Sequence, residues 1–255
     1  MRTMRPTVET HESTNWSLCR QVAWFVSLIG VAVLVLGGGL NASASNGATV
    51  SGQVTFTGSV PAPQTVEVTR DADFCGASVS IQNLVVDSSS KGLQGVVVSV
   101  EGLPKPLGKS PQVTTPELRN RDCVFVPRVG TALAQEGLHL INEDPIMHNT
   151  HIHHGKRTFL NVAQVSGGRT FKKRLKRLGV LKVQCDKHEF MKASILVFDH
   201  PYYSVTDTMG HFRITGVSPG PQELTIWHEA LGTIHATVQV PERGEVSITV
   251  EYPNK

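Results

Sequence analysis

Three side chains that can bind a soft metal ion lie close together in residues 183–191. Cys185, His188 and Met191 supply a thiol, an imidazole and a thioether, in the order C-x2-H-x2-M. Copper accepts all three ligand types, whereas zinc prefers cysteine, histidine or carboxylate to a thioether. The pattern therefore indicates a copper site. The alternative is that Cys185 and Met191 are core residues and His188 lies on a surface loop, since cysteine and methionine are often buried.

Two predicted strands should hold this segment as a short loop. Residues 179–184 precede it and residues 193–198 follow it, and both have the apolar pattern of strands in one sheet. The loop supplies three ligands, so a fourth must come from elsewhere, and His148 is the best candidate. One thiolate and two imidazoles with a distant axial thioether make a blue-copper electron-transfer site.

The same residues resemble the copper sites of cupredoxins of the plastocyanin and amicyanin type. The likeness covers residues 95–198 and includes the run His148-Asn149-Thr150-His151, with residues 124–127 and 137–142 as its lead-in. One difference is that Met147 precedes the histidine, while the nearby proline is Pro145.

This resemblance implies a single type 1 copper site in a Greek-key β-sandwich. The implied copper ligands are His148, Cys185, His188 and Met191. Asn149 would brace the cysteine loop, because outer contacts of this kind fix the orientation of metal ligands. His188 would be the point where electrons enter and leave.

The rest of the chain predicts a second, small β-sandwich, so the expected fold class is all-β. No stretch shows sustained helical periodicity with caps. Thr206-Asp-x-x-Gly-x-Phe, with Pro219-Gly220 downstream, resembles the carboxypeptidase-regulatory-like β-sandwich module. The strand that usually begins this module resembles residues 50–56, which precede the copper domain.

The domain prediction follows from that order. Residues 1–44 are a signal peptide, residues 47–93 are strands of the second sandwich, residues 94–199 are the cupredoxin domain, and residues 200–255 complete the second sandwich. Insertion of one domain into another is tolerated where chain ends lie close together. The simpler alternative is an extended cupredoxin followed by a small C-terminal lobe.

A nearly continuous apolar run at residues 22–40 predicts export. Arg20 precedes the run, and Asn41-Ala-Ser-Ala44 after it resembles a signal-peptidase cleavage site. We expect cleavage after Ala44 and location in a bacterial periplasm or cell envelope. The alternative is an uncleaved membrane anchor, because about 20 apolar residues can span a bilayer.

Cysteine usage predicts one disulfide. Cys19 leaves with the signal peptide and Cys185 is assigned to the metal, so Cys75 and Cys123 remain. An exported protein meets an oxidising compartment, where a Cys75–Cys123 disulfide is favoured over two free thiols.

The charge balance is too mild to indicate a nucleic-acid partner, and we expect none. The 255-residue chain has a formal charge of +3, and removal of residues 1–44 leaves 21 basic and 19 acidic residues, a net charge of +2. One basic stretch stands out, consisting of Lys172, Lys173, Arg174, Lys176 and Arg177. It is either a solvated face or a docking site for an acidic redox partner such as a cytochrome c or a dehydrogenase, because such patches steer encounters.

Four of the 11 histidines lie in residues 148–154. His151-x-His153 is the unit that multicopper oxidases use, but the repeated motifs of those enzymes are missing from this sequence. We therefore expect His151, His153 and His154 to be exposed or hydrogen-bonded, with a second, weaker metal site as the alternative.

The sequence as a whole predicts an exported single-electron carrier rather than an enzyme. It has no serine–histidine–aspartate order, paired-carboxylate motif or glycine-rich phosphate loop that would indicate a hydrolase or a nucleotide enzyme. The alternative function is a copper-holding or structural protein of the cell envelope, whose β-sandwich binds a partner and whose metal does not turn over. Membrane contact is expected only through an uncleaved N-terminal segment.

Overall fold

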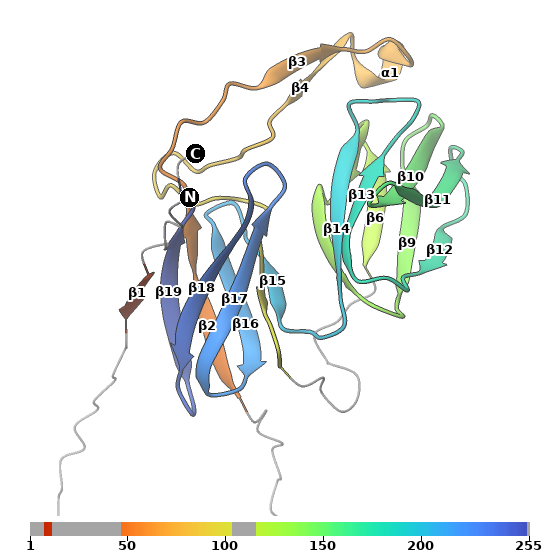
Figure 1. Ribbon diagram of the computed structural model, residues 1–255. Coiled ribbons are helices and arrows are strands. Elements are labelled where there is room, and N and C mark those ends of the chain that lie inside the picture. Colours follow the sequence, from red (N-terminus) through yellow and green to blue (C-terminus); the bar gives the residue numbers. More distant parts are fainter. Residues whose placement is uncertain (1–7, 12–46, 104–115, 254–255) are drawn as a thin grey trace, which may run out of the picture.

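The computed structural model describes residues 8–11, 47–103 and 116–253. These residues form 19 strands and one helix of four residues, which confirms the predicted all-β fold. The strands build two β-sandwiches, each with its own hydrophobic core (Figure 1).

The first sandwich, which we name the end sandwich, combines strands from both ends of the chain. One of its sheets has the order β1 (Val8–His11), β19 (Glu245–Glu251), β2 (Ala48–Thr55), β16 (His211–Val217). The other has the order β15 (Tyr203–Val205), β5 (Val97–Val100), β17 (Gly220–His228), β18 (Gly232–Val240).

The second sandwich, which we name the middle sandwich, comes from the centre of the chain. Its five-stranded sheet has the order β11 (Arg157–Gln164), β10 (His148–His154), β13 (Gly179–Gln184), β14 (Lys192–Phe198), β8 (Val129–Leu133). Its four-stranded sheet has the order β12 (Phe171–Arg174), β9 (Gly137–Asn142), β6 (Glu117–Arg121), β7 (Val124–Val126).

Alternating side chains explain how the sandwiches form. In β19 every second residue is buried, and the buried face consists of Val246, Ile248 and Val250. A strand with one apolar and one polar face packs one side on a core and leaves the other in solvent. The same alternation along β16 and β18 completes the core of the end sandwich.

The motif at residues 206–212 is a tight turn that enters β16. The Asp207 carboxylate accepts the backbone N–H groups of Met209 and His211 at 2.9 and 2.8 Å. Gly210 has a φ of 79°, and a Cβ atom there would lie 2.4 Å from the Val54 carbonyl oxygen. Only glycine fits this position, because its backbone is left-handed and lies against the neighbouring strand.

The position of β5 differs from the predicted domain boundary. Residues 94–199 were expected to form the cupredoxin domain, but Val97–Val100 pairs with β15 and β17 of the end sandwich. β2 pairs with β16 and with β19. These pairings support the proposal that the middle sandwich is inserted into the end sandwich. The N-terminal boundary of the insertion lies after β5 rather than at residue 94.

A cluster of polar groups connects the two sandwiches. Arg128, next to β8, binds the Glu229 carboxylate at 2.9 Å and the Asn83 side chain at 2.8 Å. The second oxygen of Glu229 accepts the Ser194 hydroxyl at 3.0 Å. Because Ser194 belongs to β14 and Glu229 follows β17, this cluster joins the two sheets.

A third unit, which we name the arm, comprises residues 57–83. It contains β3 (Gln64–Glu67), α1 (Ala72–Cys75) and β4 (Ser78–Ile81), with β3 and β4 paired antiparallel. The arm leaves the end sandwich after β2 and extends to the middle sandwich, where α1 lies over the loop between β13 and β14 (Figure 1).

Residues 8–11 of the predicted signal peptide form β1, which pairs with β19, whereas the apolar segment at residues 22–40 and the predicted cleavage site after Ala44 lie outside the described residues. Within the described residues, no helix has the length and hydropathy needed to cross a bilayer. Export and cleavage therefore stay predictions.

Candidate metal centre

The predicted ligand loop joins β13 to β14, and the two strands pair antiparallel up to Gln184 and Lys192. The Cys185 N–H donates to the Met191 carbonyl at 3.2 Å, and the Met191 N–H donates to the His188 carbonyl at 2.9 Å. These bonds close the loop and place Cys185 and Met191 side by side at its base. Both side chains are buried in the core of the middle sandwich.

His148 reaches the same place from the start of β10. That strand pairs with β13, so its first residues lie beside the ligand loop. His188 Nδ1 lies 3.0 Å from His148 Nδ1 and 3.7 Å from Cys185 Sγ. The three side chains are buried, and their potential ligand atoms lie within 4.8 Å of one another. His148 thus converges with Cys185 and His188, which lie 37 and 40 positions later in the sequence.

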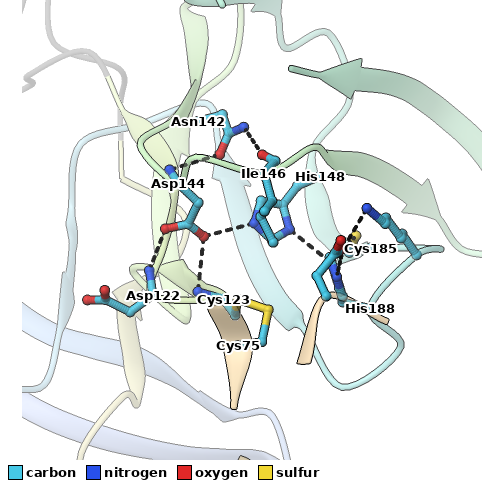
Figure 2. Close-up of a disulfide and its surroundings, with 11 residues drawn as sticks. Cys75, Asp122, Cys123, Asn142, Asp144, Ile146, His148, Cys185 and His188 are labelled. Atoms are coloured by element: carbon cyan, nitrogen blue, oxygen red, sulfur yellow. Dashed lines mark hydrogen bonds and ion pairs between the residues drawn. A yellow bond between two sulfur atoms is a disulfide. The ribbon is translucent and has the colours of Figure 1, made fainter. Parts of the chain in front are cut away.

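The outer nitrogen of His148 is bound to a buried carboxylate. Asp144 Oδ2 lies 2.8 Å from His148 Nε2, and Asp144 also accepts the backbone N–H groups of Asp122 and Cys123 at 2.7 and 3.0 Å (Figure 2). Burial lowers the pKa of His148, and the neighbouring Asp144 carboxylate partly offsets this effect. Asp144 therefore fixes the orientation of the ring.

The outer nitrogen of His188 is also bound to a carboxylate, which comes from the arm. Asp71 Oδ2 lies 2.8 Å from His188 Nε2 and 2.5 Å from Lys187 Nζ. The Lys187 ammonium group and, to a lesser extent, His188 lower the pKa of Asp71, so this carboxylate is ionised at neutral pH.

These two carboxylates determine what the histidines can do at the centre. A carboxylate accepts a hydrogen bond, so Nε2 is the donor atom of each ring, and in a neutral imidazole Nδ1 then keeps its lone pair. Two imidazole lone pairs and one sulfur then point into the same small space. This arrangement fits a metal ion that favours nitrogen and sulfur ligands, because a bound cation balances the facing lone pairs.

Asn149 connects β10 with the ligand loop. Its side-chain oxygen accepts the backbone N–H groups of Asp186 and Lys187 at 2.7 and 3.3 Å, and the Asn149 N–H donates to Cys185 Sγ at 3.5 Å. Its amide nitrogen donates to Asn161 and Asp186. These are contacts that a residue bracing the cysteine loop would make.

The predicted disulfide between Cys75 and Cys123 is confirmed, with the two Cα atoms 5.6 Å apart. Cys75 belongs to the helix of the arm, and Cys123 lies in the turn between β6 and β7. Cys185 is a free, buried thiol. A possible ligand group of Cys123, Asp144 and His148 is therefore not a separate metal site, because Cys123 is oxidised.

Neither Asp71 nor Asp144 was identified from the sequence. Asp144 carries a weak signal, because it lies four residues before His148 at the end of a strand. Asp71 lies 117 residues from its partner and carries no signal that spacing could reveal.

The histidines that follow His148 are hydrogen-bonded or stacked. His151 contacts Asp186 and the Thr158 hydroxyl at 2.9 Å, and its ring lies 3.9 Å from that of His153. His154 Nε2 lies 3.1 Å from the Leu178 carbonyl. The candidate metal groups found among the described residues do not include these three.

The basic stretch lies at the edge of the four-stranded sheet, where β12 pairs with β9. Lys173 is half-buried, with its ammonium group 5.5 Å from the centre of the Phe159 ring. The other four basic side chains are exposed: Lys172, Arg174, Lys176 and Arg177. The patch is therefore open to a partner at four of its five positions.

No family model and no curated protein sequence matches this chain. Solved structures with partial similarity include the Cu-containing nitrite reductase from Thermus scotoductus SA-01, with 18% identity over 38% of this chain and a TM-score of 0.31. The chain spans only 25% of the length of that reductase.

Two smaller structures are matched over nearly their whole length. Amicyanin from Paracoccus versutus has 16% identity over 40% of this chain and 97% of its own, with a TM-score of 0.31. A purple cupredoxin from Nitrosopumilus maritimus has 16% identity over 32% of this chain and 99% of its own, with a TM-score of 0.29. Similarity at this level carries no conclusion about activity.

Proposed function

We propose that this protein is a mononuclear type 1 copper protein that carries single electrons. The observation that carries the proposal is the convergence of three buried side chains, His148, His188 and Cys185, whose potential ligand atoms lie within 4.8 Å of one another. A thiolate with two imidazoles selects copper over hard cations, and the buried thioether of Met191 favours copper over zinc. Copper bound there would supply one-electron exchange between its two oxidation states.

In this proposal the protein holds the metal ligands in fixed orientations through hydrogen bonds. Asp144 and Asn149 fix His148 and the cysteine loop by the contacts described above. Ligands held in place need little rearrangement when the charge at the centre changes, and outer contacts of this kind tune metal affinity. In this proposal no residue is catalytic, because the protein transfers electrons without making or breaking bonds in a substrate.

A second candidate function is copper holding without turnover. The cupredoxin resemblance implies that His188 is the point where electrons enter and leave, a role for which an exposed ring is suited. The His188 side chain is instead only 1% exposed, and its outer nitrogen is bound to Asp71 of the arm. This covered edge favours a protein that retains its metal.

Copper titration followed by absorption spectroscopy separates these candidates. An electron carrier gives an intense visible band from thiolate-to-copper charge transfer at one copper per chain, together with reversible reduction. A holding protein gives a pale product, or a coloured one that does not exchange electrons with small redox mediators. If the purified protein binds no copper, both proposals fail.

We also propose an exported location, in a bacterial periplasm or cell envelope. The Cys75–Cys123 disulfide supports this proposal, because structural disulfides form and persist in oxidising compartments. The predicted signal peptide has the same implication.

The proposed docking role of the basic stretch gives a testable prediction. Changing both Lys172 and Arg174 to glutamate should slow electron transfer to an acidic cytochrome c at low salt, because both side chains are exposed and lie on one face of β12. The difference should shrink as salt is added, since the screening length is about 8 Å at physiological ionic strength. Stopped-flow absorption measures the rates.

The matched control is Lys156→Glu, an exposed lysine in the turn between β10 and β11. The copper spectrum should be unchanged in all of these variants. Equal low-salt rates in the double variant and the parent protein would identify the stretch as a solvated face.

A further inference from the structure

The histidine that would face a redox partner in this centre is covered by another part of the chain. His188 is buried, and the group on its outer nitrogen is Asp71 of the arm, at 2.8 Å. Asp71 is also paired with Lys187 of the ligand loop. The tip of the arm is therefore bound to two consecutive residues of that loop.

The arm has almost no core of its own. Between Thr57 and Asn83 the only buried side chain is Val68, and α1 buries none of its residues. A two-stranded hairpin is marginally stable by itself in water. The arm therefore needs contacts with the middle sandwich to keep its position.

The disulfide supplies the strongest of these contacts. Cys75 lies at the end of α1, and its N–H donates to the Asp71 carbonyl at 2.9 Å. Its partner Cys123 donates its own N–H to the Asp144 carboxylate, which binds His148 (Figure 2). The disulfide thus links two series of contacts. One runs from Cys75 through Asp71 to Nε2 of His188, and the other runs from Cys123 through Asp144 to Nε2 of His148.

A cavity of about 270 Å³ lies next to this cover. Val79, Ile81 and Gln82 of the arm line one side, and Phe190, Met191 and Lys192 line the other. The tip of the arm therefore contacts the ligand loop through Asp71. Strand β4 of the arm lies near the C-terminal end of the loop, and the cavity lies between β4 and the loop. The arm adds almost no buried side chains to the core of either sandwich.

We propose that Asp71 is a positioning residue for His188 and that the arm is a cover over the metal centre, closed by the Cys75–Cys123 disulfide. This inference depends on the proposed copper site and goes beyond it, because it assigns the closure of the site to a segment outside the middle sandwich. Asp71 holds the His188 ring with Nδ1 directed inward, and the arm keeps solvent and competing ligands from the outer edge of that ring. Retention of the metal then depends on the arm as well as on the ligands.

The first test compares Asp71→Asn and Asp71→Glu with the parent protein. The matched control is Asp73→Asn, because Asp73 is an exposed carboxylate in the helix that begins directly after Asp71. Copper(I)-loaded protein is mixed with excess bathocuproine disulfonate, and the coloured copper complex is followed over time. We expect copper loss to be about 10-fold faster in Asp71→Asn, in keeping with the 10- to 100-fold effect of outer ligand contacts on metal affinity. Asp73→Asn should match the parent, and Asp71→Glu should recover part of the difference.

A second readout reports the contact itself and does not depend on copper retention. In metal-free, 15N-labelled protein, the Nε2–H proton of His188 should give a protected, hydrogen-bonded NMR signal. That signal should disappear or move upfield in Asp71→Asn and stay unchanged in Asp73→Asn. If Asp71→Asn matches Asp73→Asn in both measurements, Asp71 does not position His188.

The disulfide is tested with the double variant Cys75→Ser, Cys123→Ser. We expect it to lose copper(I) at least as fast as Asp71→Asn, and adding Asp71→Asn to it should change the rate little, because residues of one unit are not additive. A native far-ultraviolet circular dichroism spectrum confirms that each variant is folded. A folded double variant that loses copper at the parental rate would overturn the role of the disulfide as the closure of the cover.

The failure of this inference can be distinguished from failure of the proposed function. A parent protein that binds no copper refutes the copper site, whereas the NMR test of Asp71 and His188 still reports on the contact. A copper-binding parent with unaffected Asp71 variants refutes the cover and leaves the copper site in place.

Discussion

Replacing Cys185 with serine is expected to abolish the visible thiolate-to-copper absorption. Cys185 is the only free cysteine among the described residues, and it lies at the base of the ligand loop. An alcohol stays protonated at neutral pH and is a hard ligand, so it can supply neither the charge-transfer donor nor the affinity of a thiolate. Titration with copper(II), followed by absorption, measures the loss.

The matched control is Glu189→Gln, which changes an exposed side chain of the same loop. It should keep the full band and the same copper stoichiometry. The serine variant should keep its fold, because Cys185 and serine are similar in size. An unchanged band in the Cys185→Ser variant would refute the assignment of the ligand loop.

Replacing Asp144 with alanine is expected to lower the free energy of unfolding by about 2–4 kcal/mol. Asp144 is 4% exposed and serves three partners, namely the backbone N–H groups of Asp122 and Cys123 and the Nε2 atom of His148. Each buried group left without a partner costs about 1–3 kcal/mol. Urea unfolding of the metal-free protein measures this loss.

The same variant should also bind copper(I) about 10- to 100-fold more weakly, because His148 loses the group that fixes its orientation. Asp122→Asn is the matched control, since the Asp122 side chain is exposed and asparagine tolerates the left-handed backbone of that residue, with a φ of 52°. Competition with a chelator measures the affinity. Parental stability and affinity in the alanine variant would show that Asp144 does not support His148.

The ligand loop and the fold class could be predicted from the sequence because the signals for them are local. Cys185 and His188 are three residues apart, and the strands on both sides carry their own apolar pattern. The lack of helical periodicity indicated an all-β chain. The disulfide was predicted by elimination among few cysteines and a predicted export signal, and the structure confirms it.

The covering of the site was decided by the tertiary structure alone. Asp71 lies 117 residues from His188 along the chain, and Cys75 lies 48 residues from Cys123. Their positions depend on β2 pairing with β16 and β19, because the arm leaves the end sandwich directly after β2. The expectation that electrons enter and leave at His188 followed from the loop and its resemblance, neither of which includes the arm. Residue patterns report which face of a strand is buried, but a contact between distant segments arises only when sheets close and pack, so no local pattern encodes it.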